Sequence, residues 1–227
     1  VSGDRVVSVS LINNNLIGTI PSSIGDLNAL TILDLSGNTL SGGIPATINS
    51  LTLLESLNLS SNNFTGTVPL LNNLTNLSFC ELYDNSLSGA VPDFSGNLLL
   101  FYLDLSFNAL NGTIAGLSVA NTPELFYINL SENNLSGNIP VSLAALTKLE
   151  TINLNENQIT GTIPANLSNL ANLSWLALSN NLLTGSIPTT FSSLSNLATL
   201  ALEHNQLTGG IPAGLSNIPG LSNLTLH

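Results

Sequence analysis

Apolar and polar residues alternate in a fixed order along residues 149–164, LETINLNENQITGTIP. Ile152 and Leu154 are two residues apart, so their side chains point to the same face of a short strand. Thr151, Asn153 and Asn155 then point to the opposite face, and Asn155→Ala should change the stability little. The pattern predicts a short strand with one buried and one open face, followed by a turn that ends in an isoleucine and a proline.

This pattern, LxxLxLxxNxLxGxIP, recurs at intervals of 23 to 25 residues along the whole chain. Such a period predicts a solenoid, in which each coil buries its apolar side only by stacking on its neighbours. We therefore expect one domain over residues 1–227, with about ten repeats, the last one truncated, and no end caps. The repeats start at Val6, Leu30, Leu54, Leu77, Leu100, Leu125, Leu149, Leu173, Leu197 and Leu221.

An asparagine occupies the same position in each of the nine complete repeats. An amide has donors and an acceptor that can satisfy backbone groups where the bonding of the sheet stops, so we predict a buried asparagine ladder. Loss of one rung should cost about 1–3 kcal/mol. The alternative is a row of ligand-binding amides. The ladder positions are Asn14, Asn38, Asn62, Asn85, Asn108, Asn133, Asn157, Asn181 and Asn205.

Most repeats close with a glycine and then Ile-Pro or Val-Pro. The residue before a proline is held in extended geometry, which predicts a second short strand. Proline suits the first turn of a helix, so segments 21–30 and 140–149 should form one or two helical or 3₁₀ turns. The fifth repeat has no proline at Ala115 and is 25 residues long, so we expect it to bulge.

The motif with its Gly-x-Ile-Pro element resembles the plant-type leucine-rich repeat over Val6 to His227. That family includes receptor-kinase ectodomains, receptor-like proteins and polygalacturonase-inhibiting proteins. The resemblance implies an α/β solenoid, a right-handed superhelix with a parallel concave β-sheet, short second strands and 3₁₀ or helical turns on the convex side. It also implies an extracellular, non-catalytic binding module.

Solenoids of this family are usually closed by caps carrying paired cysteines, which this sequence lacks. The terminal coils should therefore present apolar side chains to water. Either the chain is the ordered part of a longer protein, or its uncapped ends self-associate with neighbouring chains in a fibre. The residues expected to be open at the two ends are Val6, Val9, Leu11, Leu221, Leu224 and Leu226.

The chain has few charged residues, and most of them are acidic. Charged residues make up 7% of the chain, the net charge is −11, and the only basic residues are Arg5 and Lys148. Nucleic acid is excluded as a partner because it requires a basic patch, and anionic membrane surfaces are disfavoured for the same reason. No apolar run is long enough to insert into a membrane. The single cysteine, Cys80, falls at an inward strand position, where it should be a small buried apolar residue.

Ten Asn-x-Ser/Thr sequons predict an N-glycosylated protein that is secreted, on the cell surface or in the cell wall. The alternative is that repeats rich in Asn, Ser and Leu generate such triplets by chance. Asn58 and Asn129 fall on the concave strands, where a glycan would obstruct the sheet. The sequons are at Asn58, Asn63, Asn73, Asn76, Asn111, Asn129, Asn134, Asn166, Asn172 and Asn223.

Acidic and aromatic side chains gather at the outward positions of the concave strands and the turns that follow, which hold nine of the thirteen acids. Adjacent strands are about 5 Å apart, so the aromatic side chains should form one patch. They either decorate a solvated sheet or line a groove for a peptide, protein or glycan ligand, with acids for cations and rings for stacking. The predicted ligand-binding residues are Phe79, Glu81, Tyr83, Tyr102, Asp104, Tyr127 and Trp175.

No residues suggest catalysis, a metal site or a cofactor. His204 falls on a turn and His227 at the end of the sequence, and neither belongs to a triad arrangement. No cluster has metal-ligand spacing. Glu81 and Asp104 could mimic a glycosidase pair, but a column of acids on a sheet lacks a pocket.

Three classes of function remain open from the sequence. The first is a recognition ectodomain or secreted binding protein. The second is a structural extracellular glycoprotein that stacks end to end into a fibre or matrix. The third is a surface that binds ice or polysaccharide, for which regular arrays of Asn, Ser and Thr are suited.

Overall fold

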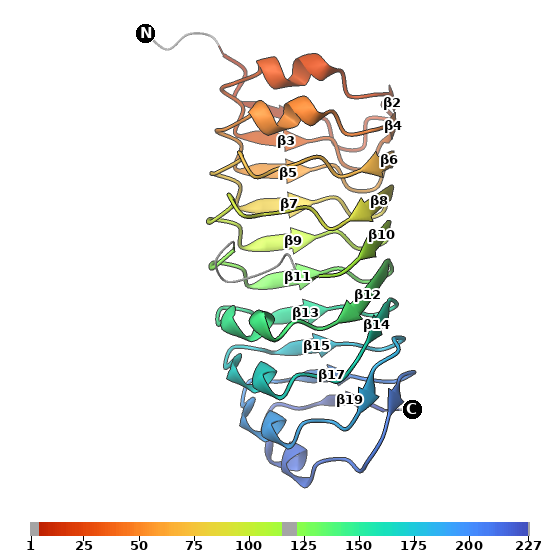
Figure 1. Ribbon diagram of the computed structural model, residues 1–227. Helices are drawn as coiled ribbons and strands as arrows, with labels where there is room; N and C mark the ends of the chain where they lie inside the picture. The colour runs from red at the N-terminus through yellow and green to blue at the C-terminus, as the bar shows by residue number, and fades with distance from the viewer. Residues whose placement is uncertain (1–4, 115–121, 227) are drawn as a thin grey trace.

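The structure is a computed structural model that describes residues 5–114 and 122–226. Figure 1 shows the coils stacked from the N-terminal to the C-terminal end, with one short strand of each coil aligned in a single column. A second set of strands follows one edge of this column, and short 3₁₀ helices lie on the side facing the viewer. The predicted leucine-rich-repeat solenoid is confirmed.

The main sheet has ten parallel strands within the described residues, each paired with the strand of the next coil. The pairing is in register, so Tyr102 of one strand is opposite Tyr127 of the next. Equivalent positions of successive repeats therefore form straight columns across the sheet. The strands are β1 (Ser8–Ser10), β3 (Ile32–Asp34), β5 (Ser56–Asn58), β7 (Phe79–Glu81), β9 (Tyr102–Asp104), β11 (Tyr127–Asn129), β13 (Thr151–Asn153), β15 (Trp175–Ala177), β17 (Thr199–Ala201) and β19 (Asn223–Thr225).

The predicted second strands form where each coil turns toward its Ile-Pro pair. In the described chain they make a seven-stranded parallel sheet and a separate two-stranded one. A glycine with positive φ, such as Gly137 at 76°, lets each coil bend at this edge. The strands are β2 (Ile17–Gly18), β4 (Thr39–Gly42), β6 (Asn63–Thr67), β8 (Ser86–Ala90), β10 (Ala109–Gly112), β12 (Asn134–Asn138), β14 (Gln158–Thr160), β16 (Thr184–Gly185) and β18 (Gln206–Leu207).

The convex turns are 3₁₀ rather than α-helical. Each 3₁₀ helix follows an extended proline, as at Pro140, which is preorganised for the first turn. The coils that contain Pro69 and Pro92 make simple turns instead. The bulge expected at Ala115 lies outside the described residues. The helices found in the described chain are η1 (Ser22–Asp26), η2 (Ala46–Ser50), η3 (Val141–Ala145), η4 (Ala165–Asn169), η5 (Thr189–Ser193) and η6 (Ala213–Asn217).

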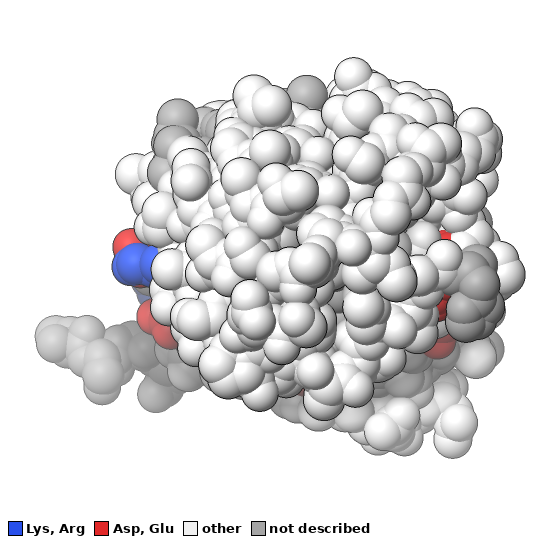
Figure 2. All heavy atoms as spheres, turned by 90° about the horizontal axis from the view of Figure 1, so that it is seen from below, with Lys and Arg blue, Asp and Glu red and all other residues white. Residues whose placement is uncertain are grey.

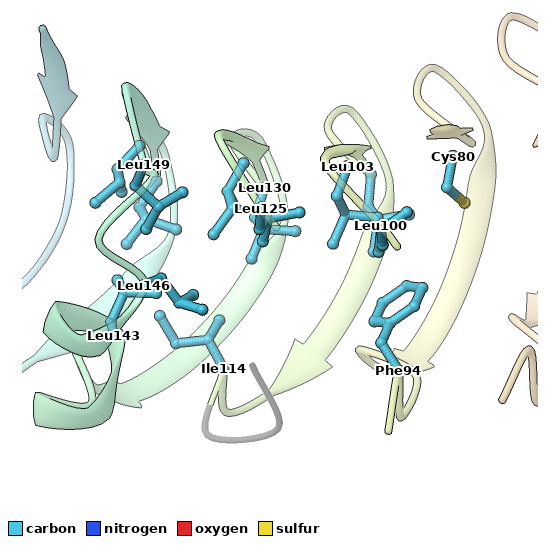
Figure 3. Close-up of a cluster of buried hydrophobic side chains, with 14 of the residues drawn as sticks. Cys80, Phe94, Leu100, Leu103, Ile114, Leu125, Leu130, Leu143, Leu146 and Leu149 are labelled. Atoms are coloured by element: carbon cyan, nitrogen blue, oxygen red, sulfur yellow. The ribbon is translucent and has the colours of Figure 1, made fainter. Parts of the chain in front are cut away.

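Leucines of successive coils stack into one continuous core. Figure 3 shows inward side chains such as Leu103, Leu125 and Leu149 repeating from coil to coil. Cys80 takes the inward position of β7 and is fully buried, as the pattern predicts. Burial raises the pKa of its thiol to about 12, so the thiolate that reacts as a nucleophile is disfavoured.

The ladder asparagines join each coil to the one before it. The Asn157 amide nitrogen donates to the carbonyls of Leu130, Leu154 and Asn155 at 3.0, 3.2 and 3.0 Å. Its oxygen accepts from the backbone N–H of Leu135 at 2.9 Å. The same kind of network recurs at every rung from Asn38 to Asn205.

The first rung is different. Asn14 is exposed, and its amide donates only to the carbonyl of Ile12 at 2.9 Å. The described residues contain no coil before it whose carbonyl it could reach. The hydrogen-bonded ladder therefore runs from Asn38 onward, and its rungs are buried except for Asn85, Asn108 and Asn205, which are half-buried.

Charged side chains occupy only parts of the surface. Figure 2 looks onto the C-terminal end of the stack and shows red atoms at two sides, with blue atoms at one of them and a wide uncharged area between. Within the described residues, the second strands contain no charged residue. Most of the acids are therefore left for the concave sheet and the turns beside it.

Candidate recognition surface on the concave sheet

Three rings form a continuous stack across adjacent strands. Phe79, Tyr102 and Tyr127 are the first residues of β7, β9 and β11. The ring centroids of Phe79 and Tyr102 are 4.6 Å apart, and those of Tyr102 and Tyr127 are 4.2 Å apart with planes 1° from parallel. The three side chains are half-buried because each ring covers its neighbour, and their outer edges remain open to a ligand.

A second column of rings extends the stack. Phe101 and Phe126 precede Tyr102 and Tyr127 in the chain, and their rings stack at 5.5 Å. Phe126 also meets Tyr102 edge-on at 6.2 Å. We call the five rings of Phe79, Phe101, Tyr102, Phe126 and Tyr127 the aromatic patch. The residues selected from the sequence omitted Phe101 and Phe126, although the Phe-Tyr pair repeated in two successive coils was the signal for them.

Acidic side chains lie in the column two residues further along each strand. Glu81 is half-buried and accepts from the Asn58 amide at 2.7 Å. Burial raises the pKa of Glu81, and the charges of Asp104 and Asp34 raise it further. These carboxylates repel one another across the sheet, so a cation placed between them would relieve that repulsion.

Asp104 is more enclosed than the alternating pattern predicts, because only 6% of it is exposed. It accepts from the hydroxyl of Ser106 at 2.6 Å and from the Asn129 amide at 3.0 Å. Burial raises the pKa of Asp104, while these hydrogen bonds oppose the rise. Asp104 therefore contributes to this surface more through its charge than through direct contact with a ligand.

Two other predicted residues flank the aromatic patch. Trp175 begins β15 and is 43% exposed. It shares the column of Tyr127, with Thr151 between them. Tyr83 follows β7 and is half-buried, outside the stacked rings.

The sequons divide into three groups. In one group the amide nitrogen donates to a backbone carbonyl of the preceding coil, as at Asn76, Asn166 and Asn172. Asn129 is 9% exposed, and its amide nitrogen, the atom that would carry a glycan, donates to Asp104 and Ser106. The Asn58 amide donates to Glu81. At both asparagines the side-chain oxygen accepts a hydrogen bond from the serine two residues later, so each triplet forms a local turn. The buried Asn129 is therefore not among the proposed glycosylation sites.

Five sequon asparagines are exposed and have no side-chain bond from the amide nitrogen within the described residues. They are the acceptors that the geometry favours. These are Asn63, Asn73, Asn111, Asn134 and Asn223.

The described residues contain no group of three or more His, Cys, Asp or Glu side chains arranged to hold a metal ion. His204 is exposed in a turn with φ of 55°. None of the helices in residues 5–114 and 122–226 has the length and apolar character needed to cross a membrane.

Comparisons with known proteins agree with the repeat pattern. A family profile described as "Leucine rich repeat" matches residues 4–64, 123–183 and 171–227, more than half of the chain. The chain belongs to the leucine rich repeat family. A comparison of this leucine-rich-repeat chain with curated proteins returned no match.

Solved structures confirm the plant-type class. One is the ectodomain of the Arabidopsis thaliana receptor kinase GASSHO1/SCHENGEN3 in complex with CASPARIAN STRIP INTEGRITY FACTOR 2, with 38% identity, a TM-score of 0.93, and coverage of 96% of this chain and 26% of that one. Another is the Arabidopsis receptor kinase HAESA in complex with the peptide hormone IDA and the co-receptor SERK1, with 32% identity, a TM-score of 0.87, and coverage of 97% and 41%. The leucine-rich-repeat chain thus spans less than half of these receptor structures.

A plant ice-binding protein is also similar, with 28% identity and a TM-score of 0.73. Here the match covers 98% of this chain and 82% of that one.

Proposed function

We propose that this chain is a non-catalytic extracellular recognition module that binds an extended peptide or protein segment on its concave sheet. The aromatic patch is the observation that carries the proposal. Five rings on three adjacent strands give a rigid, apolar surface, and stacked rings present area to a ligand at little cost in side-chain entropy. The similar receptor ectodomains, which are in complex with a peptide hormone or an integrity factor, support this class of ligand.

The charge of the concave face favours a basic ligand. Glu81 and Asp104 lie beside the rings, and the chain carries a net charge of −11. A negative field speeds the association of cationic partners and weakens as salt increases. The experiment that tests the proposal uses a panel of immobilised 12-residue peptides that vary in net charge and aromatic content, at low and at physiological salt.

The Tyr102→Ala variant should bind the best peptide about 5- to 150-fold more weakly, since a ring at the centre of an interface contributes about 1–3 kcal/mol. Phe107→Ala is the matched control, because Phe107 is an exposed ring outside the aromatic patch and is not among the predicted ligand-binding residues, and this variant should bind with the affinity of the wild type. Equal affinities of the wild type and Tyr102→Ala would contradict the proposal.

N-linked glycans on the exposed sequons belong to the same proposal. We expect some of Asn63, Asn73, Asn111, Asn134 and Asn223 to be occupied in the native protein. Intact mass before and after deglycosylation, with peptide mapping, measures occupancy. A native protein whose mass does not change would contradict both glycosylation and the extracellular location inferred from it.

A second candidate is ice binding through the second strands. The hydroxyls of Ser41, Ser136, Thr184 and Thr208 each donate to a glycine carbonyl of the preceding coil at 3.2 to 3.3 Å. Each hydroxyl is thereby held in one orientation with its lone pairs left for solvent. A fixed, uncharged array of this kind fits ordered water, and the similarity to a plant ice-binding protein favours it.

Thermal hysteresis and inhibition of ice recrystallisation separate the two candidates. Thr184→Tyr should abolish any ice activity, because a large ring breaks the array, while Tyr102→Ala should leave it unchanged. No activity in the wild-type protein would rule out this second candidate.

A further inference from the structure

The column of rings on the concave sheet has a gap of one strand. Phe79, Tyr102 and Tyr127 occupy successive strands, Thr151 follows, and Trp175 comes next. Neighbouring strands are about 4.8 Å apart, so the strands that carry Tyr127 and Trp175 are about 10 Å apart. Successive rings in the stack lie one strand apart, at 4.6 and 4.2 Å. The gap therefore has the width that one more planar group would fill.

Aromatic side chains stand on both sides of this gap. Tyr102 covers one face of Tyr127, and no other ring of the described residues stacks on the face toward Thr151. Trp175 is 43% exposed and has no aromatic neighbour in the described part of the chain. Thr151 is half-buried and provides a short side chain at the base.

An acid stands beside the gap where the preceding coils have a ring. Glu150 holds the position that Phe101 and Phe126 hold in the two coils before it, as the matching backbone bonds of Phe126 and Glu150 show. Glu150 is exposed. The nearby Lys148 is paired with Glu124 of the preceding coil, so its charge is already engaged.

We propose that this gap, the Thr151 slot formed by Tyr127, Glu150, Thr151 and Trp175, binds the guanidinium group of an arginine in the ligand. A guanidinium is planar and permanently charged, so it can stack between two rings while its N–H groups meet a carboxylate. A lysine ammonium has the charge without the plane, and a neutral urea group has the plane without the charge. The inference rests on the proposed peptide-binding function and specifies one side chain of its ligand.

Trp175 supplies the measurement, because it is the only tryptophan in the chain. N-acetyl-arginine amide should change its fluorescence in a saturable way at low ionic strength. The lysine analogue should bind more weakly, and the neutral citrulline analogue about 5- to 30-fold more weakly than arginine, since cation–π and carboxylate contacts are both lost. Equal responses to the arginine and citrulline analogues would overturn the proposal.

Two ring insertions give a matched pair of variants. Thr151→Tyr fills the slot and should remove the arginine response by at least about tenfold. Ser56→Tyr adds the same ring to the same column beside Phe79, at the other end of the stack, and should leave the response unchanged. Glu150→Gln tests the carboxylate and should weaken arginine more than citrulline.

The 12-residue peptide panel distinguishes the failure of this inference from the failure of the proposed function. If Tyr102→Ala weakens peptide binding but N-acetyl-arginine amide gives no Trp175 response and Thr151→Tyr changes nothing, the arginine-binding slot is contradicted while the recognition surface is supported. If no peptide binds but the Trp175 response to arginine shows the predicted pattern, the slot stands and the peptide-binding function is wrong.

Discussion

At the residue scale, individual asparagine side chains hold neighbouring coils together. Asn157 is 9% exposed and makes four backbone bonds. Asn157→Ala should lower the free energy of unfolding by about 1–3 kcal/mol, because it leaves buried donors and acceptors without partners. Urea unfolding of the unglycosylated chain measures this change.

Asn134→Ala is the matched control, since Asn134 is an exposed asparagine with no side-chain bond in the described structure. Asn155, which the sequence pattern suggests as a neutral outward position, is unsuitable because its side-chain oxygen accepts from the Ser179 N–H at 2.7 Å. Equal losses for Asn157→Ala and Asn134→Ala would contradict the ladder.

Asp104 gives the stability a defined dependence on pH. Burial raises its pKa in the folded chain above the ordinary value of 3.8, so the folded state holds the proton more tightly than the unfolded state. Ionised Asp104 therefore destabilises the folded state at a pH above the folded pKa. This destabilisation disappears as the pH falls through the folded pKa toward 3.8 and Asp104 becomes protonated.

The Asp104→Asn variant tests this sign. Stability of the wild type relative to Asp104→Asn should increase as the pH is lowered from 7 toward 4, measured by urea unfolding at each pH. A relative stability that falls on acidification would contradict the assignment.

Glycine sets the geometry of each coil at the scale of elements. Gly137 has φ of 76°, and an added Cβ would lie 2.9 Å from the Thr113 methyl group. Gly66 has the same φ with nothing within 4 Å, whereas Gly43 has no positive φ and its nearest atom is 3.9 Å away. The three positions separate backbone strain from steric contact.

The stability lost on substitution by alanine should increase from Gly43 to Gly66 to Gly137. Gly43→Ala should be close to neutral, Gly66→Ala should cost about 1–2 kcal/mol for the left-handed backbone, and Gly137→Ala should cost more because a contact is added. Thermal unfolding of the three variants measures the ranking. An equal cost at Gly43 and Gly66 would show that the positive φ is not the constraint.

The sequence predicts elements better than their local detail. The period and the register predict both sheets, the inward place of Cys80 and the convex turns, because these depend on apolar alternation and on proline. A turn after the main strand adopts φ of 51–55° at residues as different as Ser61, Phe107 and Glu156. Only stacking against neighbouring coils can hold such residues there, so sequence chemistry could not show it.

The positions of the candidate site's side chains could be predicted from the sequence in outline for a similar reason. Alternation places the rings and acids on the concave face, but it cannot show that side-chain bonds from neighbouring coils enclose Asp104 and Asn129. Asn97 is another case: it is fully buried and donates to the carbonyls of Leu71 and Leu74 at 3.0 and 2.8 Å. It stands where the repeat pattern has a leucine.

For the whole molecule, self-association through the ends stays a prediction. Val6 and Leu11 are 48% and 42% exposed, as expected, whereas the other four predicted end residues are half-buried against the core: Val9, Leu221, Leu224 and Leu226. Sedimentation velocity at rising protein concentration should show growth beyond the monomer if these coils stack on other chains. A single monomeric species across that range would contradict end-to-end assembly.

Ligands should bind across the aromatic patch on the concave sheet. Hydroxyl-radical labelling of side chains, with and without the best-binding peptide of the panel, measures which side chains a ligand covers. Bound peptide should protect Phe101, Tyr102, Phe126 and Tyr127, while Val141 on the convex side should be labelled as before. Unchanged labelling of these rings, with protection elsewhere, would contradict it.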